Sequence, residues 1–171
     1  MRKTRFTQMV VLVCIGSLAG CSSGEEAYSI GIVLHEVMEK LERHFNVQIF
    51  ATDIDRDALT RASTGIYPEA VAADLSPRQL TRYFNRRNDG FQIQRSIREM
   101  VVFAQHNLIT DPPFTNLDLV CCRNLLIYFD RPTQEQALRT LGRLLREEGA
   151  LFLGHAEVGL LLNQWTPSAR Y

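Results

Sequence analysis

Short apolar runs recur along this chain, and most of them are separated by stretches with the periodicity of a helix. The runs are Met9–Ile15, Val47–Thr52, Val101–Ala104, Leu117–Cys122 and Ala150–Leu153. Runs of this length without polar alternation are typical of parallel strands that are buried on both faces. Because strands alternate with helices, the pattern predicts an open α/β sheet with right-handed crossovers.

The helices are predicted from the spacing of apolar residues. The first is expected over Glu25–Phe45, with Ser22 or Ser23 capping its N-terminus. Two more are expected over Ile54–Ser63, before Gly65, and over Thr133–Glu147. Residues 66–100 do not continue the alternation of apolar runs and long helices. Ser76-Pro77 opens a short helix, and a polar turn at Asn85–Gly90 precedes a small strand at Phe91–Gln94.

The bulk composition restricts the class of protein. A length of 171 residues suits one domain, and 46% hydrophobic residues suit a globular one. The 19 basic and 19 acidic residues cancel, so no overall charge favours nucleic acid or a membrane surface. The four cysteines are too few and too oddly placed for a disulfide framework. We expect Cys121 and Cys122 to point to opposite faces of a strand as buried thiols. A zinc site that combines them with His106 and His155 lacks paired CxxC spacing, so no metal is expected.

The N-terminus carries a second pattern that competes with the first strand. Met1–Arg5 is basic, Met9–Ala19 is largely apolar, and Leu18–Cys21 is similar to a bacterial lipoprotein cleavage box. The apolar stretch is too short to span a membrane. Export would remove the segment that must form the first strand, so the two interpretations exclude each other. We favour the strand because the downstream features depend on it.

Polar residues follow three of the predicted strands, where parallel sheets bind ligands. The loop Gly20–Glu25 combines glycines with the free amides of a helix N-terminus. Asp53 ends the second strand and can accept hydrogen bonds from a ribose diol. Asn107 could hydrogen-bond a purine edge, and Leu108 could pack on its face. Together these positions predict a nucleoside cofactor.

Each of these residues also has a purely structural interpretation. Asp53 could cap the helix that starts near Asp55, and Asn107 could be a turn residue. Glu25 could simply complement the helix dipole.

The choice among nucleosides comes from a family resemblance. The segments Ala19–Ile30, Phe50–Asp55, Cys122–Phe129 and Gly154–Glu157 together resemble CheR, the protein-glutamate methyltransferase of bacterial chemotaxis receptors. The resemblance covers about residues 19–160, and Asp111–Phe114 is most similar to versions fused to CheB-type methylesterases. It implies a Rossmann-like class I methyltransferase sheet with helices on both faces. A methyltransferase domain is then expected over 19–171, with an inserted subdomain at about 66–100 and an atypical segment at 1–18.

The resemblance also implies a cofactor, S-adenosyl-L-methionine, and roles for individual residues. The cofactor-binding residues are expected to be Gly20, Ser22, Gly24, Glu25, Asp53, Asn107, Leu108, Arg123 and Asn124. Tyr128 and Arg123 are expected at the site of methyl transfer. The implied reaction methylates glutamate side chains of a chemotaxis receptor in the cytoplasm. No nucleic acid and no membrane insertion are expected.

Two alternatives accompany this interpretation. Asp111–Phe114 is similar to the signature of amino methyltransferases that act on nucleic acids, but in those enzymes it follows the fourth strand and here it precedes Leu117–Cys122. The second alternative is a fragment that binds the cofactor without activity. The family's helical N-terminal domain and its Thr-x-Phe-Phe-Arg segment are not found in this sequence, and the family's last strands should lie beyond Tyr171. We therefore expect a piece of a larger enzyme.

Overall fold

The computed structural model describes residues 8–14, 23–155 and 157–158. Its main feature is a five-stranded sheet in the order β6-β2-β1-β7-β8, and every neighbouring pair in it is parallel. The strands are β1 (Gln8–Cys14), β2 (Asn46–Asp53), β6 (Val101–Gln105), β7 (Leu117–Cys122) and β8 (Leu145–Leu153). All five apolar runs predicted as strands are therefore strands of one parallel sheet.

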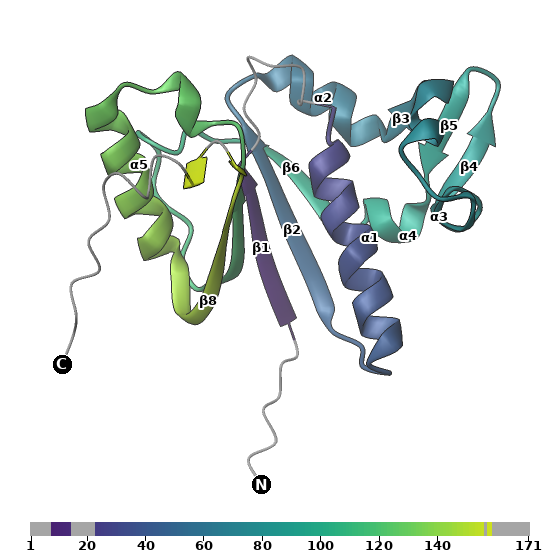
Figure 1. The fold of residues 1–171 in the computed structure, drawn as a ribbon, viewed down its shortest axis with the longest axis horizontal. Coiled ribbons are helices and arrows are strands. Elements are labelled where there is room, and N and C mark those ends of the chain that lie inside the picture. The colour runs from purple at the N-terminus through teal and green to yellow at the C-terminus, as the bar shows by residue number, and fades with distance from the viewer. Residues whose placement is uncertain (1–7, 15–22, 156, 159–171) are drawn as a thin grey trace, which may run out of the picture.

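Helices cover both faces of this sheet, as Figure 1 shows. On one face, α1 (Glu25–Lys40) buries Ala27 and Ile32 against the sheet. On the other face, α5 (Arg131–Leu144) packs against β7 and β8. The helix α2 (Arg56–Thr64) packs on β2 and β6 and ends at Gly65, which has a left-handed conformation with φ of 61°.

The adjacent cysteines show how the sheet separates two cores. Cys121 belongs to the apolar cluster under α1, and Cys122 belongs to the cluster under α5. Both are buried. Their placement confirms the expectation that they point to opposite faces of one strand.

A second sheet lies beside α1, on the side away from α5 (Figure 1). Its three antiparallel strands are β3 (Ile66–Tyr67), β4 (Phe84–Arg87) and β5 (Gly90–Ile93), in the order β3-β5-β4. Between β3 and β4 run the 3-10 helix η2 (Glu69–Ala73) and α3 (Pro77–Tyr83), and α4 (Arg95–Arg98) follows β5 and contacts α1. Ser76 caps α3 in a capping box with Gln79.

Several predicted boundaries are wrong. The first helix ends at Lys40 rather than Phe45, and its N-cap is Gly24 rather than Ser22 or Ser23, with no side-chain cap hydrogen bond. The last helix ends at Leu144, because Leu145 already pairs with Leu117 and begins β8. Long-range pairing thus overrides a helical pattern that continues locally.

The polar turn predicted at Asn85–Gly90 is also shorter than expected. Strand β4 extends through Arg87, and Asn85 pairs with Gln92 across the hairpin. Only residues 88–89 form the turn. The strand tolerates the polar side chains of residues 85–87 because these are exposed to solvent, while their backbones join the ladder.

The first strand occupies the centre of the main sheet. Along β1, residues 8–14 pair with β2 on one side, and residues 11–14 pair with β7 on the other. This is the place that the strand interpretation of the apolar N-terminal stretch requires. Ile15 and the loop Ala19–Ser22 lie outside the described residues.

Candidate functional site

The order of the strands in the main sheet reverses at β1. The chain leaves β1 toward β2 on one side and later returns through β7 on the other, so the order reverses at β1. Open α/β sheets bind ligands at such a reversal point, beyond the carboxyl ends of the strands. The carboxyl ends of β1, β2 and β7 therefore lie side by side at one end of the sheet. Gly20 and Ser22, predicted to bind the cofactor, lie outside the described residues.

The described end of the loop after β1 is tightly packed. Gly24 has φ of 80°, and a Cβ built on it would lie 3.0 Å from the Phe103 ring and 3.1 Å from the Ala62 methyl. A side chain at this position would be strained by both the conformation and the contacts. The neighbouring Ser23 has a buried Oγ with no hydrogen-bond partner among the described residues.

Asp53 stands at the end of β2 and is only 3% exposed. Its Oδ1 accepts a hydrogen bond from the Asp55 backbone N–H at 2.9 Å, and its Oδ2 is buried without a partner in the described structure. Burial raises the pKa of Asp53, against the backbone hydrogen bonds from Asp55 and Ile54, which lower it. An unpaired buried acceptor costs about 1–3 kcal/mol, so this oxygen gains most from an added donor.

The alternative role of Asp53 as a helix cap is filled by another residue. Asp55 is the N-cap of α2, and its Oδ1 accepts from the backbone N–H groups of Asp57 (2.8 Å) and Ala58 (3.1 Å). Asp53 makes neither of these hydrogen bonds. The carboxylate of Asp53 is therefore not the N-cap of α2.

An apolar side chain stands next to Asp53. Ile54 is 61% exposed, although it adjoins a buried strand. Its carbonyl accepts a hydrogen bond from Gln105 Nε2 at 3.0 Å, which ties the corner after β2 to the end of β6. An exposed apolar surface beside a buried carboxylate can bind a planar base next to its sugar.

Asn107 and Leu108, which follow β6, both make contacts within the protein that explain their positions without a ligand. Asn107 Oδ1 accepts hydrogen bonds from the backbone N–H groups of Ile109 (2.9 Å) and Thr110 (3.4 Å), as in an Asx turn. Leu108 is buried and belongs to the cluster under α5. Roles for both residues next to adenine stay predictions.

The turn after β7 brings opposite charges together. Arg123 Nη1 lies 3.8 Å from Glu26 Oε1 in the first turn of α1. Burial raises the pKa of Glu26, the Arg123 guanidinium lowers it, and Glu157 raises it. Glu26 Oε1 is buried and accepts no hydrogen bond from the described residues. Asn124 follows in the left-handed region with φ of 54°, and its side chain is exposed.

The buried carboxylate of Glu157 hydrogen-bonds to the turn after β7. Glu157 is 0% exposed, and its Oε1 accepts from the Leu125 backbone N–H at 3.1 Å. A Cβ on Gly154 would lie 2.5 Å from Glu157 Oε2, so only glycine leaves room for the carboxylate. Glu157 thus joins the end of β8 to the turn that carries Arg123.

Tyr128 stands one short turn further along the chain. It ends the 3-10 helix η3 (Leu126–Tyr128) and is 41% exposed. The turn is held from α5 by Gln134, whose Nε2 donates to the carbonyls of Leu126 (3.0 Å) and Phe129 (2.9 Å). Tyr128 is therefore presented to solvent on a fixed turn.

The predicted residues are only partly brought together. Arg123 lies close to Glu26, which the sequence had not singled out, in the first turn of α1, two residues after Gly24, while Glu25 of the same helical turn is exposed. The sequence could not separate Glu25 from Glu26, because both are adjacent acids in a first turn. The sequence includes Glu157 in the motif Gly154–Glu157, but no sequence pattern predicts that its side chain is buried.

The segment Asp111–Phe114 has a packing role. It lies between β6 and β7, before β7 as the sequence predicts. The Phe114 ring packs on Phe50 and His106 at centroid distances of 5.3 and 4.8 Å. The His106 ring also hydrogen-bonds the Pro112 carbonyl at 3.1 Å.

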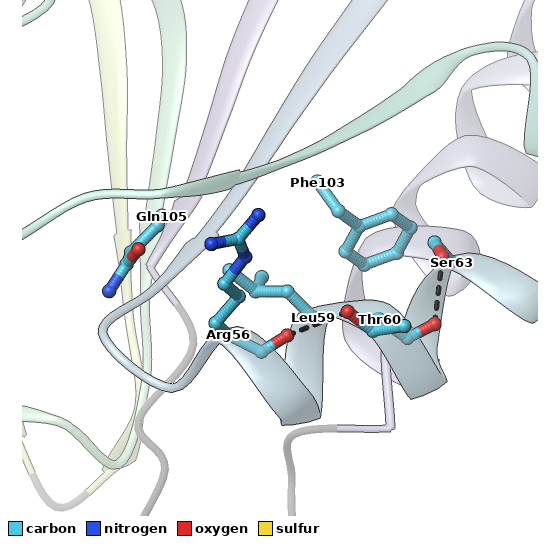
Figure 2. Close-up of a pocket in the computed structure, with 6 residues that line it drawn as sticks. All are labelled: Arg56, Leu59, Thr60, Ser63, Phe103 and Gln105. Atoms are coloured by element: carbon cyan, nitrogen blue, oxygen red, sulfur yellow. Dashed lines mark hydrogen bonds between the residues drawn. The ribbon is translucent and has the colours of Figure 1, made fainter.

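A separate hollow of about 380 Å³ lies between α2 and β6 (Figure 2). It is lined by Arg56, Leu59, Thr60, Ser63, Phe103 and Gln105. None of the residues predicted from the sequence lines it. Within the described ranges, no group of three or more His, Cys, Asp or Glu side chains could hold a metal ion. In the same ranges, no helix is both long and apolar enough to cross a bilayer.

The residues at the sheet edge fit a cofactor rich in hydrogen-bond donors. Four buried oxygens of this region have no hydrogen-bond partner in the described structure: Ser23 Oγ, Glu26 Oε1, Asp53 Oδ2 and Glu157 Oε2. Three of them belong to carboxylates, which accept from hydroxyl and ammonium groups. S-adenosylmethionine carries both, on its ribose and on its amino-acid end.

Comparison with known proteins places these features in a family. Residues 13–169 match the family described as CheR methyltransferase, SAM binding domain. An uncharacterized 104.1 kDa protein of Rhodobacter capsulatus is 45% identical over 81% of this chain and 15% of its own length. The chemotaxis protein methyltransferases of Borreliella burgdorferi and Escherichia coli are each 39% identical over 81% of this chain and 50% of theirs.

This chain thus spans about half the length of those methyltransferases. Among solved structures, the glycopeptide N-methyltransferase MtfA complexed with S-adenosylmethionine has a TM-score of 0.49 and 11% identity, over 88% of this chain and 45% of that one. The family match covers most of the chain and agrees with the expected fold and with S-adenosylmethionine as cofactor. The chain belongs to the family of CheR methyltransferase SAM-binding domains.

Proposed function

We propose that this chain binds S-adenosylmethionine as part of a cytoplasmic enzyme that methylates glutamate side chains of chemotaxis receptors. The observation that carries the proposal is Asp53, a 3% exposed carboxylate at the end of β2, next to the strand at which the order reverses. One of its buried oxygens is unpaired in the described structure. A ribose diol supplies the donors that this oxygen lacks. The named relatives, which are chemotaxis protein methyltransferases, support the receptor as substrate.

We assign the other predicted residues to different parts of the cofactor. Gly20, Ser22 and Gly24 form the loop that approaches the cofactor, and Arg123 with Asn124 lines the end that carries the methionine moiety. Glu25 and Glu26 are both candidates for its amino group, and we favour Glu26 because its side chain lies 3.8 Å from Arg123. Asn107 and Leu108 flank the adenine from the end of β6. Residues 66–100 form the inserted subdomain of the domain expected over 19–171, to which β1 (Gln8–Cys14) adds the central strand.

The bound cofactor supplies a methyl group on a positively charged sulfur. A glutamate side chain has a pKa near 4.3, so at neutral pH it is already ionised and needs no general base. The protein's task is to align the carboxylate oxygen with the methyl carbon and to handle two charges that disappear together. Arg123 can hold a carboxylate, and the Tyr128 hydroxyl can orient the accepting one.

Binding is tested by calorimetry of the 171-residue chain with S-adenosylhomocysteine. We expect micromolar affinity in the parent chain and loss of binding in Asp53→Asn, which keeps the shape of the side chain but replaces one acceptor by a donor. Asp57→Asn is the matched control, because this exposed aspartate lies near the same strand-to-helix corner. No binding by the parent chain would contradict cofactor binding by this chain.

Transfer is tested with cofactor labelled in its methyl group and a receptor signalling fragment as acceptor. We expect base-labile label on glutamate side chains, reduced at least about tenfold by Tyr128→Phe and by Arg123→Ala. Unchanged labelling in both variants would contradict the catalytic roles. Cofactor binding without any labelling would show a binding fragment rather than an active domain.

A further inference from the structure

The small antiparallel sheet reaches the cofactor loop through one side chain. Tyr67 lies in β3, is 4% exposed, and donates its hydroxyl to the Ser23 carbonyl at 3.0 Å. Ser23 directly precedes Gly24, the N-cap of α1. This hydrogen bond therefore joins residues 44 positions apart in the sequence, one in the small sheet and one in the loop.

Tyr67 is held rigidly on its own side of this contact. Its backbone pairs with Phe91 of β5, and a Cβ on Gly90 would lie 2.1 Å from the Tyr67 carbonyl oxygen. Its ring makes edge contacts with Phe84 of β4 and with Tyr28 of α1, at centroid distances of 6.3 and 6.4 Å. The position of its hydroxyl is thus set by the small sheet as a whole.

The loop side of the contact is set by peptide geometry. A peptide unit is planar, so its C=O and N–H point in opposite directions. Holding the Ser23 carbonyl toward Tyr67 therefore turns the Gly24 N–H away from the small sheet. Gly24 stands at the start of a 16-residue helix, where free backbone N–H groups and the helix dipole favour acceptors on a ligand.

We propose that Tyr67 is a positioning residue for cofactor binding, which orients the Ser23–Gly24 peptide and couples the small sheet to the cofactor loop. The inference rests on the proposed function, because it assumes that the loop binds S-adenosylmethionine. Tyr67 does not touch the cofactor in this assignment. It acts through the backbone of the loop, so its effect falls on binding affinity.

Tyr28 offers a matched control. Like Tyr67, it is a buried tyrosine (2% exposed) that donates its hydroxyl to a backbone carbonyl, here that of Ala62 at 3.1 Å in α2. Burial raises the pKa of Tyr28 to about 12 and raises that of Tyr67 as well, so both hydroxyls are protonated donors at neutral pH. Each change to phenylalanine removes one such donor and keeps the ring, but only Tyr67→Phe releases the loop.

The test measures S-adenosylhomocysteine affinity and thermal unfolding of the 171-residue chain and the two variants. We expect both variants to lose similar thermal stability, while Tyr67→Phe alone binds about fivefold to tenfold more weakly. We also expect the ligand to slow amide exchange in β3 and β5 of the parent chain and not of Tyr67→Phe. Coupling between two sites is reciprocal, so this protection should accompany the affinity difference.

Two results would overturn the inference and are distinguishable from each other. If the parent chain binds and both variants bind equally well, Tyr67 has only a structural role while the proposed function stands. If the parent chain does not bind at all, the proposed function fails and the inference fails with it.

Discussion

At the scale of single residues, the site is built from carboxylates that the fold buries without full compensation. Asp53 and Glu26 each have a raised pKa, in both cases mainly because of burial. Each also has one buried oxygen without a hydrogen-bond partner in the described structure. Such groups destabilise the empty protein and favour a ligand that brings donors.

Replacing Asp53 by asparagine should therefore stabilise the empty chain at neutral pH. Burial raises the pKa of Asp53, so the folded state binds its proton more tightly than the unfolded state does. Stability contributed by the protonated form is present below the ordinary aspartate pKa of about 3.9 and is lost as the pH rises through the raised value. The uncharged amide introduced by Asp53→Asn does not titrate and has no such loss.

Thermal unfolding followed by circular dichroism between about pH 3.5 and 8 checks this expectation, with the pH range set about the ordinary aspartate pKa. The variant should melt at a higher temperature than the parent at neutral pH, and the difference should shrink toward the acid end. A difference independent of pH would show that something other than ionisation of Asp53 is responsible.

At the scale of elements, the corner between β2 and α2 separates a capping residue from a binding residue. Asp55 satisfies two backbone N–H groups at the start of α2, and Asp53 receives the N–H of Asp55 itself. Two acids that stand close together in the sequence thus have different tasks. The division depends on Asp55 having an extended conformation, with φ of −86° and ψ of 105°.

Removing the cap should cost stability without removing the carboxylate of the site. We expect Asp55→Ala to lower the free energy of unfolding by about 1 kcal/mol and Asp55→Asn to lower it by only a few tenths, because asparagine also caps. Urea denaturation of both variants measures this. Equal losses in the two variants would mean that the charge, rather than the capping hydrogen bonds, stabilises α2.

At the scale of the whole molecule, the parallel sheet joins two apolar clusters, one under α1 and one under α5. Strands β2, β1 and β7 have neighbours on both sides, whereas β6 and β8 stand at the edges of the described sheet. The helix α3, which directly precedes β4 of the small sheet, is joined to α1 by the hydrogen bond between His35 and Tyr83 (3.2 Å). We therefore expect the sheet to be most stable at its central strands, whose carboxyl ends carry the candidate site.

Amide exchange should follow this arrangement. We expect the slowest exchange in β1, β2 and β7, and faster exchange in β6, β8 and the small sheet, because edge strands open without disrupting the core. Exchange measured by mass spectrometry or NMR checks the order. Exchange in β8 as slow as in β1 would mean that further chain covers the edge of β8.

Much of this organisation was predictable from local sequence. The five strands of the main sheet, Gly65 at the end of α2 and Asp53 at a strand end follow from apolar runs and turn chemistry, which act over a few residues. The motifs at Ala19–Ile30 and Cys122–Phe129 also identified the family, since their residue types and spacing are specific to it.

Other features depend on segments that are distant in the sequence. Pairing with Leu117 makes Leu145 a strand residue, and the position of Arg123 distinguishes Glu26 from Glu25. The contact between Tyr67 and Ser23 has no local signal at all. Hydrophobic periodicity determines which elements form, because it is a property of neighbouring residues. The direction of each polar side chain is set by packing between elements, so the site's contacts emerge only when the strands assemble.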